Sequence, residues 1–226
     1  MTEYPIIHAP ADLAHWIDHT ILAPDATEAQ VERLCREATK HGFRSVCVNP
    51  VHVAFVAAAL RGTVVAACSV VSFPFGATPT RAKVAEAAMA VEDGADEVDM
   101  VLALGLLKAG HLDAVRADVA AVKRACGSAV LKVIIETCLL TDEQKVTACR
   151  LSQEAGADFV KTSTGYGSAG ATVSDVSLMR RTIGPEMGVK AAGGIRTFET
   201  AKAMIEAGAT RIGASASLAI IGASPA

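Results

Sequence analysis

Two lysines and an aspartate occupy apolar, strand-like runs in which charged side chains are unusual. Lys161 follows Phe159 and Val160 in "FVKTSTGYG", and Asp99 and Lys190 lie in "DEVDMV" and "GVKAAGG". Charges in such runs are seldom buried unless a partner or a function requires them. Three interpretations are open: a reactive amine with its proton relay, a structural Lys-Asp-Lys ion network, or a lysine that reaches solvent past its apolar stem.

A pair of lysines can do carbonyl chemistry when one lowers the pKa of the other. Two ammonium groups ~6 Å apart repel by roughly 3 kcal/mol at an effective dielectric of ~20, which is about two pKa units. Partial desolvation acts in the same direction, and only a neutral amine attacks a carbonyl carbon. We therefore expect Lys161 to form a Schiff base, Lys190 to lower its pKa, and Asp99 to move protons through water.

These residues lie in segments that repeat one design, a helix that ends at a glycine and passes into a strand. The four copies are "KHGFRSVCV" (40–48), "EDGADEVDMV" (92–101), "EAGADFVKTS" (154–163) and "EAGATRIGAS" (206–215). Further strand-like runs are "WIDHT" (16–20), "TVVAACSVV" (63–71), "AVLKVIIET" (129–137) and "GVKAAGG" (188–194). Capping-box patterns at "TEAQ" (27–30) and "TDEQ" (141–144) predict helix starts.

Eight strands with helices between them, in 226 residues without a long linker, predict an α/β fold of one domain over residues 1–226. The architecture that fits is a single (β/α)8 TIM barrel, and a doubly wound open sheet is the alternative. Five residues after the four repeat glycines come Cys47, Asp99, Lys161 and Gly213. In a barrel these four share one inward layer on alternate strands, with Gly213 leaving space.

The odd-numbered strands offer charged residues to the neighbouring layers. They are Asp18, Lys132 and Lys190. Asp18, Lys132 and the thiol of Cys47 are secondary candidates for the pocket. For Cys47 two interpretations are open, a thiol that an aldehyde can reach or an inert buried thiol.

The loops after the last two strands, "GGIRT" (193–197) and "GASAS" (213–217), are candidates for a phosphate site. Loops at these places in a barrel often bind phosphate, because glycines let backbone N–H groups approach and a helix N-terminus favours an anion. Thr197 is expected to cap the following helix. Ordinary turns and helix starts remain the other interpretation.

Composition excludes several classes of protein. The net charge of −3, without a basic block, argues against nucleic acid, and no apolar run reaches membrane-spanning length. The beginning of the chain lacks a secretory pattern, and six cysteines without a C-x-x-C pair are typical of reduced thiols, so a cytoplasmic protein is expected. The six histidines lack metal-ligand spacing, which predicts no metal, and His19 in "DHT" is expected to pack or to form hydrogen bonds.

The motifs taken in order resemble those of the deoxyribose-phosphate aldolases, a family of class I aldolases built on a (β/α)8 barrel. The resemblance runs from "WIDHTILAPDAT" through "SVCVNP", "DEVDMV", "LKVIIET" and "FVKTSTGYG" to "KAAGGIRT" and "RIGAS". It implies a lyase without a metal or organic cofactor, active on a small phosphosugar and aldehydes in deoxyribose phosphate catabolism, and often a homodimer or higher homo-oligomer. The reaction implied is the reversible cleavage of 2-deoxy-D-ribose 5-phosphate to D-glyceraldehyde 3-phosphate and acetaldehyde.

Roles for individual residues follow from the same resemblance. Lys161 would form the imine and Asp99 and Lys190 the proton relay. The remaining matches would bind the substrate and its phosphate: Gly193, Gly194, Gly213, Ser215, Thr164 and Gly165. Ala216 stands where a second serine is frequent, which puts phosphate affinity in question. A phosphosugar isomerase or epimerase with a carboxylate base, and a non-catalytic phosphosugar-binding regulator, are the alternatives.

Overall fold

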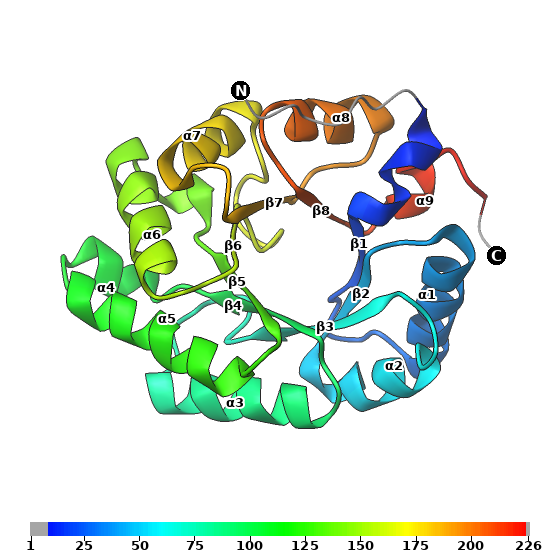
Figure 1. Ribbon diagram of the computed structural model, residues 1–226, viewed down its shortest axis with the longest axis horizontal. Coiled ribbons are helices and arrows are strands. Elements are labelled where there is room, and N and C mark those ends of the chain that lie inside the picture. The colour runs from blue at the N-terminus through cyan, green and yellow to red at the C-terminus, as the bar shows by residue number, and fades with distance from the viewer. Residues whose placement is uncertain (1–8, 225–226) are drawn as a thin grey trace.

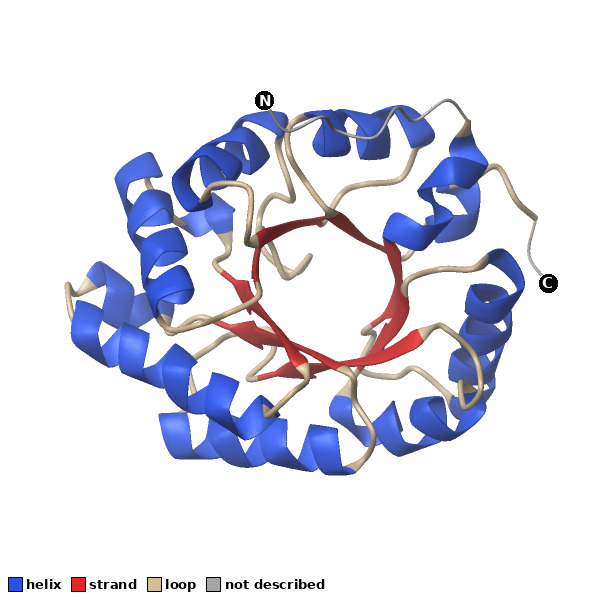
Figure 2. Ribbon diagram, in the orientation of Figure 1, coloured by secondary structure: helices blue, strands red, loops and turns tan. Residues whose placement is uncertain are grey.

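A closed barrel of eight parallel strands forms the centre of the computed structural model, which describes residues 9–224. Consecutive strands are neighbours and β8 pairs with β1, so the sheet closes on itself (Figures 1 and 2). The predicted (β/α)8 barrel is confirmed, and closure excludes the open sheet. The strands are β1 (Ile17–Ile21), β2 (Ser45–Val48), β3 (Ala66–Val71), β4 (Glu97–Val101), β5 (Val130–Ile134), β6 (Phe159–Lys161), β7 (Gly188–Ala192) and β8 (Arg211–Ala214).

Helices surround the barrel as an outer layer (Figure 2). They are α1 (Glu28–His41), α2 (Val53–Ala59), α3 (Thr80–Glu92), α4 (Leu104–Lys108), α5 (Leu112–Cys126), α6 (Asp142–Glu154), α7 (Val173–Ile183), α8 (Phe198–Glu206) and α9 (Ser217–Ile220). Three 3-10 segments complete the elements: η1 (Pro10–Trp16), η2 (Pro50–His52) and η3 (Thr137–Leu139). Within residues 9–224 no helix has the length and apolar character needed to cross a membrane.

Local sequence explains where several helices begin and end. Thr27 and Thr141 form the two predicted capping boxes, in which the threonine side chain accepts from the backbone N–H of a glutamine three residues later. Thr197 caps α8 as expected by accepting from the Thr200 N–H. Gly42 ends α1 in the left-handed region at φ 69°, which an L side chain seldom adopts.

Alternation along the strands separates an apolar layer from a charged interior. In β4, Val98 and Met100 belong to the apolar core shared with the helices, and Asp99 between them is fully buried. Lys132 and Lys190 are placed in the same way within β5 and β7. Because successive strand residues point to opposite faces, the apolar residues pack outward against helices and the charged residues enter the barrel.

Candidate active site

Asp99 binds the ammonium groups of three lysines inside the barrel. Its Oδ2 atom accepts hydrogen bonds from Lys161 Nζ and Lys190 Nζ, each at 2.7 Å. Its Oδ1 atom accepts from Lys132 Nζ, also at 2.7 Å. The expectation that Lys161 faces Asp99 across the interior is confirmed. Lys161 Nζ and Lys190 Nζ each lie 2.7 Å from the same oxygen, so the distance between the two nitrogen atoms is at most the sum of these two distances.

A second set of ion pairs lies nearer the amino-terminal ends of the strands. Arg211 Nη1 donates to Asp18 Oδ1 at 2.6 Å and to Glu97 Oε2 at 2.7 Å. Lys190 Nζ lies 2.5 Å from Asp18 Oδ2, and Lys132 Nζ lies 2.7 Å from Glu97 Oε2. Lys132 and Lys190 therefore link the inward layer of the even-numbered strands, which contains Asp99, to the neighbouring layers of the barrel. Sequence reasoning did not single out Glu97 or Arg211, although both stand inside repeat segments that it used.

These buried groups are referred to below as the interior ion cluster. Its members are Asp18, Glu97, Asp99, Lys132, Lys161, Lys190 and Arg211. Three carboxylates face four cationic side chains, so the cluster carries one excess positive charge when every group is ionised. Excess charge in a buried site is costly, and loss of one proton from an amine removes it.

The charges of the cluster hold one another in place. Burial alone would raise the pKa of Asp99, but Lys132, Lys161 and Lys190 outweigh it and hold that pKa well below its ordinary value. Burial opposes the charge on Lys190, yet Asp18 and Asp99 raise its pKa above the ordinary value. The pKa of Lys132 is likewise raised against burial, mainly by Asp99. Lys132 and Lys190 are therefore cations at neutral pH.

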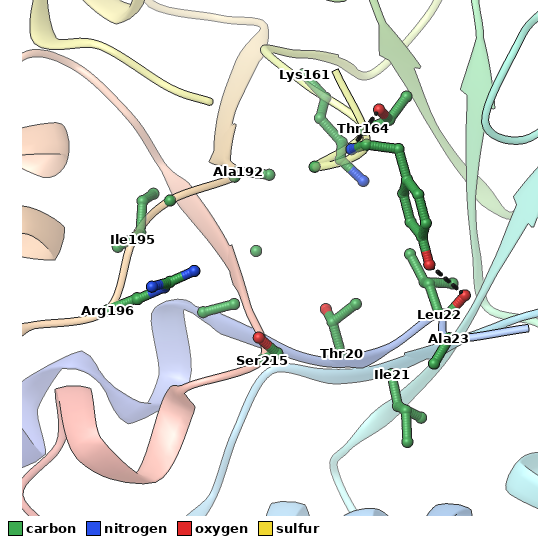
Figure 3. A pocket seen from close by; sticks show the side chains of 16 residues that line it. Thr20, Ile21, Leu22, Ala23, Lys161, Thr164, Ala192, Ile195, Arg196 and Ser215 are labelled. Atoms are coloured by element: carbon green, nitrogen blue, oxygen red, sulfur yellow. Dashed lines mark hydrogen bonds between the residues drawn. The ribbon is translucent and has the colours of Figure 1, made fainter. Parts of the chain in front are cut away.

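Lys161 ends β6 at the floor of a pocket of about 360 Å³ at the mouth of the barrel. In Figure 3 its side chain points into this space. The lining residues are Thr20, Ile21, Leu22, Ala23, Lys161, Thr164, Gly165, Tyr166, Ala192, Gly193, Gly194, Ile195, Arg196, Gly213, Ala214 and Ser215. Lys161 is thus the member of the cluster that meets the pocket.

Gly213 shapes the floor in a way that differs from the expectation. A Cβ at this position would lie 2.9 Å from Lys190 Cε and 3.0 Å from Ala192 Cβ. The space that Gly213 leaves is therefore occupied by the Lys190 side chain, which passes here to reach Asp99. Gly213 also forms part of the pocket wall. A side chain at position 213 would displace Lys190.

Backbone turns and one cation form the pocket rim, a name used below for Gly193, Gly194, Arg196 and Ser215. Gly193 and Gly194 have φ angles of 87° and 77°, a region in which glycine is favoured and which turns the chain here. The exposed Arg196 reaches toward the pocket in Figure 3, and within residues 9–224 no ion pair involves it. The motif "GGIRT" contained Arg196, and its charge beside the glycine pair was the signal that sequence reasoning missed.

The opposite wall carries Thr164 and Gly165, as predicted from the motif after Lys161. Thr164 Oγ1 donates to Glu136 Oε2 at 2.5 Å, and Glu136 is itself buried at the end of β5. Tyr166 Oη donates to the Leu22 carbonyl at 2.8 Å, and its ring meets Phe73 edge-on. These contacts tie the β6–α7 loop to the loops after β1, β3 and β5.

Asp18, Cys47 and Lys132, the secondary candidates, lie below the pocket rather than in its wall. All three are fully buried, since their positions on the strands are covered by the side chains at the mouth. Cys47 packs with Cys68 under Leu22 and Phe73. This burial separates Cys47 from the pocket and favours an inert thiol, although its hydrogen bond with Cys68 and the nearby Lys190 lower its pKa.

A metal ion fits the interior poorly. Within the described part of the chain, Cys47, Cys68 and Asp99 are the group whose ligand atoms lie within 4.8 Å of one another. Lys132 Nζ already lies 2.7 Å from Asp99 Oδ1 and 3.4 Å from Cys68 Sγ. A second cation would share these atoms with an ammonium group and meet its repulsion.

The closed barrel, with a lysine at the floor of a mouth pocket, defines the chain as a (β/α)8 enzyme. Residues 13–223 match the DeoC/LacD family aldolases. A protein of Rhodospirillum rubrum named deoxyribose-phosphate aldolase is 63% identical over 93% of this chain and 89% of its own length. A protein of that name from Brevibacillus brevis is 57% identical, with coverage of 91% and 93%. The chain belongs to the DeoC/LacD aldolase family, and aldolases are lyases.

A solved structure supports the same placement. The deoxyribose phosphate aldolase of Aeropyrum pernix superposes with a TM-score of 0.88 at 39% identity, covering 95% of this chain and 91% of that one. That protein is described as a tetramer of unique structure.

Proposed function

We propose that this chain is a class I aldolase that reversibly cleaves 2-deoxy-D-ribose 5-phosphate to D-glyceraldehyde 3-phosphate and acetaldehyde. The observation that carries the proposal is the position of Lys161, whose amine faces the pocket while hydrogen-bonded to Asp99 at 2.7 Å. The names of the relatives from Rhodospirillum rubrum and Brevibacillus brevis support the substrate. The relationship also supports a role in deoxyribose phosphate catabolism.

The proposed reaction begins with the neutral amine of Lys161. The interior ion cluster has one excess positive charge, and Lys161 binds one carboxylate whereas Lys190 binds two. Lys161 therefore has the fewest carboxylate partners of the three lysines, and it is the one that lines the pocket. Its nitrogen attacks C1 of the open-chain sugar, and loss of water gives the protonated imine.

Cleavage then breaks the C2–C3 bond. The C3 hydroxyl loses its proton as the bonding electrons move into the imine, which releases D-glyceraldehyde 3-phosphate and leaves an enamine on Lys161. Protonation of the enamine at its terminal carbon and hydrolysis of the resulting imine release acetaldehyde and restore the amine. Asp99 and Lys190 form the proton relay for these steps, since both are fixed beside the Lys161 nitrogen.

The pocket rim supplies the proposed phosphate site. Gly193, Gly194, Gly213 and Ser215 bring backbone close to the pocket, and Arg196 adds a positive charge free to pair with phosphate oxygens. Thr164 and Gly165 are proposed to contact the sugar from the opposite wall.

Three further properties are proposed with this function. The whole chain, residues 1–226, forms one domain, which the family match over residues 13–223 supports. A homo-oligomer is supported by the tetramer described for the Aeropyrum pernix protein. A cytoplasmic location is supported by six free cysteines, because reduced thiols are typical of that compartment.

Reductive trapping tests the imine. The protein is incubated with acetaldehyde and sodium borohydride, and peptides are mapped by mass spectrometry. We expect an ethyl group on Lys161 and loss of the label in Lys161→Arg, with Lys202→Arg on the surface of α8 as the matched control. Turnover without an adduct at Lys161 would refute the imine mechanism. Adducts distributed over several surface lysines would also refute the imine mechanism.

A further inference from the structure

A second hydrogen-bonded group lies behind the pocket rim, on the outer side of the barrel. His19 lies on β1 between two inward residues, Asp18 and Thr20, so its ring points outward toward α1 and α9. Its Nε2 atom is 2.9 Å from Glu37 Oε2, and its Nδ1 atom is 2.8 Å from Ser217 Oγ. The three residues are at most 6% exposed.

The chemistry of the partners fixes the direction of the hydrogen bond between His19 and Glu37. A carboxylate only accepts, so Nε2 of His19 carries the proton that is donated to Glu37. Burial lowers the pKa of His19, although Glu37 opposes this, which favours a neutral ring at neutral pH. The Ser217 hydroxyl lies 2.8 Å from Nδ1 and 3.0 Å from the Ala214 carbonyl, so its one proton is shared between these two acceptors. The ring packs on Phe43 with centroids 4.9 Å apart, which limits its rotation.

Ser217 is the far end of the turn that carries Ser215. The near end of the turn, Ala214, belongs to β8 and is fixed by the barrel. Between these two ends Ser215 borders the active-site pocket on one side and a separate cavity of about 340 Å³ on the other. That cavity is lined by His19, Thr20, Ile21, Gln30, Arg33, Leu34, Glu37 and Ser215. Because open space lies behind Ser215, close packing does not hold it on that side.

We propose that His19, oriented by Glu37, is a positioning residue for the substrate phosphate. It fixes Ser217 and thereby the height of Ser215 above the pocket, while taking no part in the chemistry at Lys161. The inference rests on the proposed function, because it assigns a role within that phosphate site. Loss of the His19–Ser217 contact lets the turn relax toward the cavity, which weakens binding of the phosphate and leaves the imine steps unchanged.

Two substrates separate positioning from general stability. Cleavage of 2-deoxyribose 5-phosphate is compared with cleavage of 2-deoxyribose, which has no phosphate. In Ser217→Ala we expect KM for the phosphorylated substrate to rise about three- to tenfold, the range expected for one lost hydrogen bond, with kcat nearly unchanged. The value of kcat/KM for 2-deoxyribose should equal that of the wild type.

A matched control and a pair of histidine variants sharpen the test. Ser152→Ala removes another buried hydroxyl, one that donates to the Ala148 carbonyl within α6 far from the rim, and both substrates should be unaffected. Asparagine at position 19 places an amide near the Nδ1 position, and glutamine places one near Nε2. His19→Asn should therefore retain more phosphate preference than His19→Gln, which reaches only Glu37.

The outcomes are distinguishable from failure of the proposed function. If the wild type cleaves neither substrate, the proposed function falls and the inference falls with it. If the wild type prefers the phosphorylated substrate but Ser217→Ala slows both substrates equally, or changes neither KM, only the inference is overturned. Ser217→Ala also removes the hydrogen bond to the Ala214 carbonyl, so a rise in KM that appears in Ser217→Ala but in neither histidine variant also overturns the role of His19.

Discussion

The interior ion cluster and the pocket rim both handle charge, but they are built in opposite ways. Every member of the cluster is at least nine-tenths buried and already paired, whereas the rim has exposed turns and Arg196, for which residues 9–224 contain no ion-pair partner. A reacting amine needs charges fixed in advance in a medium of low dielectric. A phosphate brings its own charge and needs donors that are unpaired before it binds. The difference separates the residues proposed for the chemistry from those proposed for recognition of the phosphate.

The largest effect is expected from Asp99→Asn, which removes the centre of the cluster. The change leaves four cations facing two carboxylates, and loss of one partner from a buried ion pair costs about 3–5 kcal/mol of unfolding free energy. Activity should fall by about 10³-fold, because the amide no longer fixes the amines of Lys161 and Lys190. Chemical unfolding and steady-state rates measure the two effects.

The pH dependence of stability gives a separate check on Asp99. The pKa of this carboxyl lies well below the ordinary value of 3.8 in the folded protein. Its stabilising effect is therefore fully present above the unfolded pKa and is lost as pH falls toward the folded one. Between about pH 4 and pH 2, unfolding free energy should fall less steeply in Asp99→Asn than in the wild type. Equal slopes would contradict the ion pairing described for Asp99.

The next effect concerns Lys190, the second cation on Asp99 Oδ2. Lys190→Leu leaves three carboxylates facing three cations, so the excess positive charge of the cluster disappears. We expect kcat/KM to fall by about 10²-fold and its acid limb to move to higher pH. A pH–rate profile of the variant tests this, with Lys202→Leu at a half-buried lysine of the outer helix α8 as the control. An unmoved acid limb would remove Lys190 from the control of protonation.

A smaller effect, confined to recognition, is expected at the rim. Arg196→Ala should raise KM for 2-deoxyribose 5-phosphate by about 10- to 100-fold, the worth of a charged hydrogen bond, with little change in kcat. Cleavage of 2-deoxyribose should not change. The exposed Arg150 of α6 provides the matched control, Arg150→Ala. A fall in kcat for both substrates would mean that cluster and rim are not separate in function.

The smallest effect is expected from an added hydroxyl. Ala216→Ser introduces a hydroxyl next to Ser215, and one further neutral donor should lower KM for the phosphorylated substrate by about threefold. Initial-rate measurements on both sugars show whether the gain depends on the phosphate. A gain for 2-deoxyribose as well would place the hydroxyl at the sugar instead of at the phosphate.

The sequence by itself determined the order of the strands and the position of each charged residue along its strand. The repeat glycines at 42, 94, 156 and 208 set a constant distance to the inward residues, so Asp99 and Lys161 were expected to face each other. These features are local, because caps and alternation act within a few residues. The motif after Lys161 similarly placed Thr164 and Gly165 at the mouth.

Only the tertiary structure decided which charges pair and which residues meet the pocket. Asp18 and Lys132 were taken as pocket candidates, but the mouth covers them and they hold the cluster from below. Arg211 joins Asp18 across 193 positions of the sequence, and Ser217 joins His19 across 198. Long side chains reach across the barrel to the best available partner, and that partner depends on closure of the whole sheet and on small residues such as Gly213 that let them pass.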